Sequence, residues 1–486
     1  MNPAQLLIVD LPGPELDPLT RDHLARHRFG GVCLFRKNIQ NRAQVARLVR
    51  DLKDLLGEIW IAIDHEGGAV WRIDDLPRAP AAMALGALDD EERAHSVGRA
   101  VARGLISLGI NWDLAPVLDV NTNPENPVIA ERSFSSSPEQ VARLGLAFAR
   151  GLEAEGVMSS VKHFPGHGNT WVDSHLDLPV VEDPPEALEA HLFPFRRAVE
   201  AQVGSVMTAH ILYPQLDPAL PATLSPTILK KLLRQTWGYS GLIVTDSLAM
   251  KAISARYSPR EATQRALEAG ADLVLALGSI KNQEEAARGL SELPSQLLEE
   301  RLARSRLALQ RFPGTPRAYT EEEEQRDRAL MKEVAFQAIT ALGQPAIPQP
   351  EERLLLLSSG AEAGLPGVYE GHPGVNRLAQ ALRPSFPRLQ VALYRREDPQ
   401  LPPLDGIDRI LLATLAHGPL HPQEVHMARV LAQMRPVLHL ALWNPYHARA
   451  LGLPALISYG FHPEAIEGLV NVLRGAPPQG RLPVAF

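Results

Sequence analysis

Short apolar runs that end in a polar residue recur through the first two-thirds of the chain, and longer amphipathic stretches separate them. The runs are rich in β-branched and aliphatic residues, which is typical of buried strands. Eight strands are predicted, at residues 6–10, 31–35, 60–64, 112–118, 158–163, 204–208, 242–246 and 271–276. The amphipathic stretches predict helices, several of them entered through proline or an acidic first turn, at 42–56, 91–108, 138–155, 185–201, 226–235 and 259–268.

This alternation predicts an α/β fold, a (β/α)8 TIM barrel. Eight strand–helix units in about 300 residues are what such a barrel needs, and the polar residues at the strand ends would converge on its catalytic face. A doubly wound open sheet is the competing architecture, because it is built from the same repeating unit.

The rest of the chain predicts a second, smaller unit. Two Pro-rich segments, at 312–316 and 344–350, bracket a helical stretch, and alternating strands and helices then resume. We therefore expect a catalytic barrel over 1–312, a helical linker over 313–350 and an α/β sandwich domain over 351–486. The strands are expected at 353–358, 389–393, 407–413 and 437–442, and the helices at 423–434 and 463–473. Three histidines in this unit, His417, His421 and His426, are interpreted as solvated or helix-capping residues.

Composition narrows the class of protein. Of the 486 residues, 45% are apolar and 22% are charged, which is ordinary for a soluble globular enzyme. The net charge of -7 disfavours nucleic acid or an anionic membrane as a partner. The one cysteine, Cys33, lies in a predicted strand and is expected in the core. The first residues lack the basic start of a signal peptide, and no apolar stretch is long enough to span a bilayer, so we expect a cytoplasmic location.

Candidate chemistry is concentrated at residues 159–175, where an apolar strand breaks into a Pro/Gly loop that holds a lysine, three histidines and an aspartate. Within this loop Asp173 precedes His175 by two positions. A carboxylate beside an imidazole fixes the tautomer of the ring and favours its protonated form, so the pair predicts a proton-transfer device. A second candidate is Asp246, which ends an apolar strand, because a carboxylate is costly to bury unless it is used or paired.

Several motifs in chain order resemble the bacterial β-N-acetylglucosaminidases of glycoside hydrolase family 3. The stretch KHFPGHG at 162–168, followed by DSH at 173–175, is similar to the family's signature, and the resemblance extends to 64–68, 111–123, 131–134 and 244–250. The second unit resembles, less specifically, the C-terminal α/β sandwich of two-domain members. Three positions depart from the usual pattern, namely His65, Ala69 and Asn169.

The resemblance implies a retaining mechanism on a β-linked N-acetylglucosaminide such as a muropeptide fragment, as in cell-wall recycling. Asp246 would be the nucleophile, and His175, oriented by Asp173, would replace the second carboxyl group that most retaining glycosidases use as acid and base. The residues implied to bind the terminal sugar are Asp64, Arg72, Arg132, Lys162 and His163. Arg72 and Arg132 could instead pair with a neighbouring acid, and His167 and His210 are interpreted as supporting residues.

Other functions stay open at this level. A metal-dependent hydrolase could use as ligands His163, His167, Asp173, His175 and His210, although barrel enzymes of that kind usually carry His-x-His at the first strand, where this chain has Asp10. Further alternatives are another family 3 β-glycosidase, a phosphorylase, and a sugar-binding protein without catalysis. We expect hydrolysis of a small carbohydrate with no metal and no cofactor.

Overall fold

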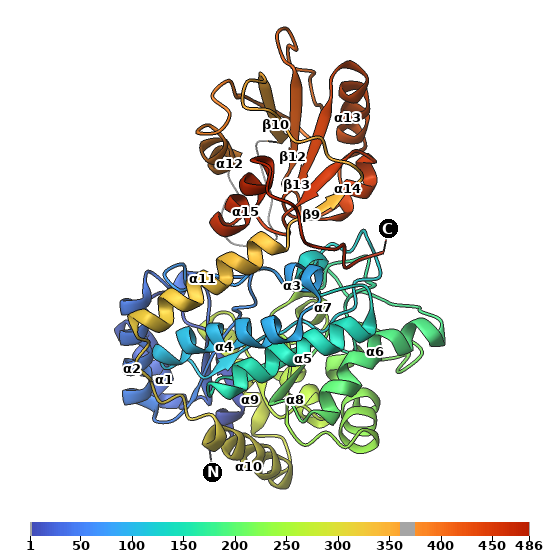
Figure 1. Ribbon diagram of the computed structural model, residues 1–486. Coiled ribbons are helices and arrows are strands. Elements are labelled where there is room, and N and C mark those ends of the chain that lie inside the picture. Colours follow the sequence, from blue (N-terminus) through green and yellow to red (C-terminus); the bar gives the residue numbers. More distant parts are fainter. Residues whose placement is uncertain (1, 360–374, 486) are drawn as a thin grey trace.

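A computed structural model describes residues 2–359 and 375–485 of the chain, and its first part is a barrel of eight parallel strands (Figure 1). The strands are β1 (Leu7–Val9), β2 (Gly31–Leu34), β3 (Trp60–Ile63), β4 (Trp112–Asp113), β5 (Met158–Phe164), β6 (Ser205–Thr208), β7 (Leu242–Val244) and β8 (Val274–Leu275). Their order in the sheet is β7-β6-β5-β4-β3-β2-β1-β8, and a parallel bridge between Val244 and Leu273 joins the two ends. The predicted TIM barrel is confirmed, and the open sheet is excluded because the sheet closes.

Helices surround this barrel. They are α1 (Pro18–His27), α2 (Arg42–Leu56), α3 (Ala82–Leu88), α4 (Glu91–Ser107), α5 (Pro138–Ala154), α6 (Pro185–Glu200), the π-helix η5 (Thr227–Thr236), α7 (Lys251–Ser254), α8 (Pro259–Ala269), α9 (Ile280–Leu290) and α10 (Ser295–Arg311). Side-chain caps fix several starts, since Asn41, Ser137 and Ser258 each accept a backbone hydrogen bond from the first turn. Within the described ranges, no helix combines the length and the apolar character that crossing a membrane requires.

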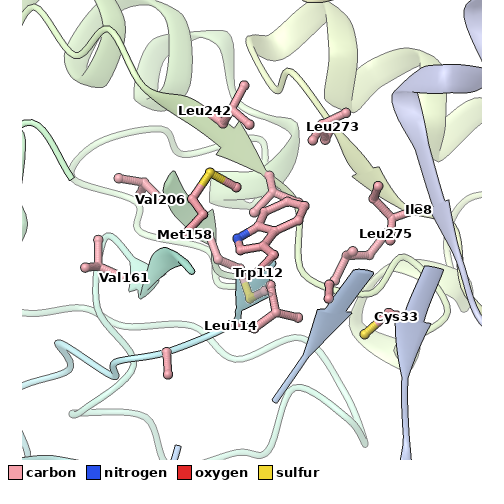
Figure 2. Close-up of a cluster of buried hydrophobic side chains, with 14 of the residues drawn as sticks. Ile8, Cys33, Trp112, Leu114, Met158, Val161, Val206, Leu242, Leu273 and Leu275 are labelled. Carbon is pink, nitrogen blue, oxygen red and sulfur yellow. The ribbon is translucent and has the colours of Figure 1, made fainter. Parts of the chain in front are cut away.

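Large side chains fill the barrel interior. Figure 2 shows Trp112 among Met158, Leu114 and other aliphatic residues contributed by most of the strands. The indole N–H of Trp112 donates to the hydroxyl of Ser205 at 3.0 Å, so its one polar atom is satisfied inside the core. Cys33 is buried in β2, which confirms its predicted core position, and burial raises the pKa of its thiol well above the ordinary value.

The fourth strand is shorter than predicted. We expected strand structure from 112 to 118, but β4 ends at Asp113. Pro116 has no backbone N–H to donate and interrupts the ladder. The chain nevertheless continues beside β5, where Val117 forms a bridge with Lys162 and the amide of Leu118 donates to the Lys162 carbonyl at 2.6 Å. The segment after β4 therefore still lies at the carboxyl end of the barrel.

The second unit is a six-stranded sheet with helices around it. Its strands, in spatial order, are β11 (Gln390–Tyr394), β10 (Leu354–Ser359), β12 (Arg409–Thr414), β13 (Val437–Ala441), β14 (Ala455–Ile457) and β9 (Thr340–Leu342), with β9 antiparallel to β14. The helices are α11 (Glu321–Gln337), α12 (Val375–Leu382), α13 (Pro422–Met434), α14 (Tyr446–Leu451) and α15 (Pro463–Leu473). This confirms the predicted α/β sandwich; β9 and β14 were not predicted, because three-residue strands give little periodic signal.

Contacts from both ends of the second unit tie it to the barrel. The α11 helix packs against α15 on one side and against α4 on the other (Figure 1). Near the end of the chain, the carbonyl of Pro483 accepts a hydrogen bond from the Ser136 amide at 3.2 Å, and the Ala485 amide donates to the Ser136 hydroxyl at 2.9 Å. The last described residues therefore lie on a loop of the barrel.

The three histidines of the second unit have different settings. His421 caps α13 and His426 is exposed, as expected. The interpretation of His417 is wrong, because its side chain is 4% exposed and its Nε2 lies 3.7 Å from Oε2 of Glu131 in the barrel. Burial lowers the pKa of His417 to about 3, and the ring is therefore neutral. Local sequence cannot predict this setting, because Glu131 is nearly 300 positions away.

A buried ion pair between α4 and α11 generates a stability prediction. Arg103 Nε donates to Asp327 Oδ2 at 2.9 Å, and both side chains are almost fully buried. Replacing Asp327 with Ala removes one of two carboxylates that pair with this guanidinium, while Glu155 stays at 3.0 Å, so we expect the free energy of unfolding to fall by about 1.5–3 kcal/mol in urea denaturation. The control is Glu333→Ala on the same helix, which breaks a partly exposed pair with Arg93 and should cost less than about 1 kcal/mol. Equal losses of stability from the two substitutions would show that the buried pair is no more stabilising than the partly exposed one.

Candidate active site

A cavity of about 200 Å³, lined by charged as well as apolar side chains, opens at the carboxyl ends of the barrel strands. Among the residues that line it are seven of the eight predicted site residues, Asp64, Arg72, Arg132, Lys162, His163, His175 and Asp246. The eighth, Asp173, lies behind His175. Every lining residue belongs to the barrel, and parallel strands bring their carboxyl ends to this one face.

Asp246 lies two residues after the end of β7, and its carboxylate lines the cavity. One carboxylate oxygen accepts a hydrogen bond from the amide of Ser247 at 2.7 Å. Burial raises the pKa of Asp246, but the imidazoles of His210, His163 and His175 and the Ser247 amide outweigh burial and hold this pKa below its ordinary value. Asp246 is therefore an anion at neutral pH, as a nucleophile must be.

The predicted Asp173–His175 pair forms in the long loop after β5. Nδ1 of His175 lies 2.7 Å from Oδ1 of Asp173, and the same oxygen accepts the backbone amide of His175 at 2.9 Å. Burial raises the pKa of Asp173, whereas the hydrogen bond and charge of His175 lower it, with a net decrease. An ionised carboxylate only accepts hydrogen bonds, so the proton lies on Nδ1 and Nε2 is left for a substrate.

A network of four charged side chains forms one wall of the cavity. Nζ of Lys162 lies 2.6 Å from a carboxylate oxygen of Asp64 and 2.6 Å from one of Glu66, and Glu66 also receives two hydrogen bonds from Arg132 at 2.8 Å. Burial raises the pKa of Glu66, but the charges of Arg132 and Lys162 overcome this and hold the pKa far below its usual range. Three strand ends thus contribute to one network of ionised groups.

His163 is held by a second carboxylate that the sequence reasoning did not single out. Nδ1 of His163 lies 2.7 Å from Oδ2 of Asp119, while Oδ1 of Asp119 accepts the backbone amides of His163 at 3.0 Å and His167 at 2.7 Å. Asp119 is the first residue after the predicted strand 112–118, so the strand-end rule that pointed to Asp246 could have found it. Glu66, also missed, lies within a quoted motif.

His167 and His210 have the settings of supporting residues. Nδ1 and Nε2 of His167 lie 2.7 Å from the hydroxyl of Thr170 and 3.1 Å from that of Ser174, so the ring connects parts of the loop that carries His175. Burial and the nearby His163 lower the pKa of His167 to about 4, and the ring is neutral. Nε2 of His210 donates to the Ser247 carbonyl at 2.8 Å and so supports the residue next to Asp246.

The three departures from the family pattern lie away from the cavity wall. His65 is buried and stacks on Trp71 with ring centroids 3.4 Å apart. Ala69 packs in a small apolar cluster with residues of the second unit, and Asn169 donates a hydrogen bond to Asp183. None of the three lines the cavity.

The donors proposed for a catalytic metal do not converge. Over residues 2–359 and 375–485, no three of the five candidate ligands come within ligand distance of one another. Nδ1 of His163 and Nδ1 of His175 each lie 2.7 Å from an aspartate oxygen.

The fold and the position of the cavity define a barrel enzyme with its site at the carboxyl ends of the strands. Residues 3–308 match the glycosyl hydrolase family 3 N terminal domain. The chain belongs to glycosyl hydrolase family 3, and the family resemblance of its motifs is thereby confirmed.

Known relatives extend this comparison. The chain is 41% identical over 299 residues to beta-hexosaminidase A of Pseudoalteromonas piscicida. The matched region is 57% of this chain and 49% of that protein, so the chain spans about half the length of this relative. The structure of a family 3 beta-N-acetylglucosaminidase from Paenibacillus sp. superposes with a TM-score of 0.90 at 31% identity, over 100% of this chain and 98% of that one. A Neisseria gonorrhoeae protein solved in complex with N-trifluoroacetyl-D-glucosamine is 34% identical, with a TM-score of 0.59 over 68% of this chain and 98% of that one.

The charged network generates a pH-dependent prediction. Replacing Glu66 with Gln removes the charge shared by Lys162 and Arg132, and we expect the free energy of unfolding at pH 7 to fall by about 3–5 kcal/mol. The folded-state pKa of Glu66 is lower than the unfolded value of about 4.5, so its contribution is complete above that value and is lost as the pH falls below it. The difference between the two proteins should therefore shrink between pH 5 and pH 3 in urea denaturation.

The matched control for this experiment is Asp74→Asn, which changes an exposed carboxylate in ion pairs with Arg36 and Arg78. It should change stability by less than about 1 kcal/mol at pH 7. A Glu66→Gln effect that stays constant down to pH 3 would show that the charge of Glu66 is not what stabilises the network.

Proposed function

We propose that this protein is a retaining β-N-acetylglucosaminidase that hydrolyses terminal N-acetylglucosamine from β-linked glycosides. The observation that carries the proposal is that Asp246 and His175 line one cavity while Asp173 holds His175 at 2.7 Å. The names of the relatives support this substrate class, and the complex of the Neisseria gonorrhoeae protein with an N-acylated glucosamine does so as well. Residues 1–312 are the proposed catalytic domain, because every cavity-lining residue lies within them.

In the first step of the proposed reaction, a carboxylate oxygen of Asp246 attacks the anomeric carbon and the glycosidic C–O bond breaks. Protonated His175 gives its Nε2 proton to the departing oxygen, and the charge of Asp173 favours the cationic ring that donates it. In the second step a water molecule gives a proton to His175 and its oxygen displaces Asp246 from the sugar. The two inversions retain the configuration of the anomeric carbon.

The proposed sugar-binding side of the cavity is the charged network with His163 and Arg72. Asp64, Lys162 and Arg132 offer charge-assisted hydrogen bonds, which are stronger than neutral ones and directional enough to orient a polyol. Because these groups are already paired with one another, they need little rearrangement before substrate binds. We infer that muropeptide fragments in the cytoplasm are the natural substrate, on the resemblance to cell-wall recycling enzymes; hydrolysis of such fragments by the purified protein, measured by mass spectrometry, tests this.

The first functional prediction concerns the nucleophile. Replacing Asp246 with Ala removes the covalent step, and no other carboxylate that lines the cavity is outside the charged network. We expect kcat/KM on an aryl β-N-acetylglucosaminide to fall by about 10⁴-fold or more, with the fold intact by circular dichroism. The exposed Glu268→Ala on α8 is the control and should retain parent activity. Residual activity of Asp246→Ala within tenfold of the parent would overturn the assignment.

The second functional prediction concerns His175. A good leaving group departs without a proton, so His175→Ala should lose most kcat/KM on aryl glycosides with poor leaving groups and least on activated ones. Since the same residue acts as base in the second step, activated substrates should show a burst of released phenol. Asp173→Ala should give the same pattern more mildly.

The test is kcat/KM for His175→Ala across aryl β-N-acetylglucosaminides of graded leaving-group pKa. The control is Asp177→Ala, which removes an exposed carboxylate on the same loop. It should change kcat/KM only slightly, and by the same factor for every substrate in the series. If His175→Ala loses the same factor on every substrate, His175 is not the general acid.

A further inference from the structure

Two helices meet outside the barrel where its first and last strands pair. The α1 helix follows β1 and the α9 helix follows β8, and these two strands pair, with Leu7 opposite Val274. His23 and His27 lie one helical turn apart on α1, and Glu284 lies on α9. Each of the three offers one ligand atom, and these atoms lie within 4.8 Å of one another. None of them lines the active-site cavity.

The hydrogen bonds of Gln283 fix the tautomer of His23. The side-chain amide nitrogen of Gln283 donates to the Asp10 carbonyl and to the Gly278 carbonyl, both at 3.1 Å. Its oxygen therefore faces Nε2 of His23, at 2.9 Å. An amide oxygen only accepts, so Nε2 carries the proton and Nδ1 of His23 carries the lone pair.

That lone pair has no hydrogen-bond partner among the described residues, although the His23 side chain is 3% exposed. Buried polar atoms without a partner are rare in folded proteins, and a metal ion would satisfy this one. A histidine whose second nitrogen donates to a fixed oxygen is also the usual arrangement of a metal ligand, because that bond sets the tautomer and the ring orientation.

The surroundings of the cluster favour a cation. His27 is the last residue of α1, where the helix dipole is negative, and its ring stacks on Phe29 with centroids 5.2 Å apart. Arg26 is hydrogen-bonded to Asp22 and lies 4.0 Å from Glu284. The carboxylate of Glu284 is therefore only weakly engaged by this arginine.

We propose that His23, through Nδ1, together with His27 and Glu284, binds a zinc ion that ties α1 to α9 beside the pairing of the first and last barrel strands. Two imidazole nitrogens and a carboxylate oxygen suit zinc, whereas magnesium and calcium prefer oxygen ligands alone. A water molecule completes a tetrahedral site. The role of this ion is structural, because it binds folded protein in which the two helices are adjacent and so stabilises that state.

The experiment titrates the metal-free full chain with zinc by calorimetry and with cobalt by visible absorption, and measures the melting temperature with and without zinc. The test variants are His27→Ala and Glu284→Gln, both partly exposed, and the matched control is Glu285→Gln, the next residue on α9. We expect the parent to gain about 3 °C or more with zinc. Both test variants should lose one zinc equivalent or bind it about 100-fold more weakly, and the control should behave as the parent.

Histidines in the active site are alternative zinc ligands to be tested, so His175→Ala is titrated in parallel. If the bound zinc disappears in His175→Ala and persists in Glu284→Gln, the ion belongs to the active site and the proposal is overturned. Parent and test variants with identical zinc binding and identical melting temperatures would also overturn it, and would leave His23, His27 and Phe29 as a packed cluster of rings.

Discussion

The architecture of the site depends on the burial of one lysine. Lys162 is 2% exposed at the end of β5, and an ammonium group in that position costs several kcal/mol unless it is paired. The loop after β3 supplies two carboxylates, and Arg132 balances the second of them from the loop after β4. Because each charge needs the others, the ends of three strands are fixed relative to one another before any substrate arrives. The wall of the cavity is thus rigid for an electrostatic reason.

The two carboxylate–histidine pairs divide the site into a fixed part and a more exposed part. His163 is buried and Asp119 holds both its ring and its backbone, close to the barrel. The side chain of His175 is 33% exposed and is attached to a long loop. The groups proposed to bind the sugar therefore belong to the rigid barrel, whereas the proposed acid and base lies on a segment that can adjust to the leaving group.

Much of this was predictable from the sequence, for reasons that particular residues make clear. Local periodicity predicts the strands and the principal barrel helices. Asp64, Lys162 and Asp246 are recognisable because each places a charge at the end of an apolar run. Asp119 was missed although the strand-end rule applied to it, and the roles of Asp119 and Glu66 become clear only through partners far along the chain. For the same reason His417 was misjudged, since burial by another domain leaves no local trace. The short strands β9 and β14 form because they pair with neighbouring strands of the sheet, and their own residues give little strand signal.

The contact between the last described residues and the barrel ties the order of folding to the order of synthesis. The hydroxyl of Ser135 donates to the carbonyl of Pro483, which is 348 positions later, and Arg132 lies only three residues before that serine. While the ribosome is still making the second unit, the loop that carries Arg132 lacks this anchor, and closing so large a loop is slow compared with the local contacts of the barrel. A newly made barrel can therefore collapse early, but the loop that carries Arg132 reaches its final position only after the distant end of the chain has docked.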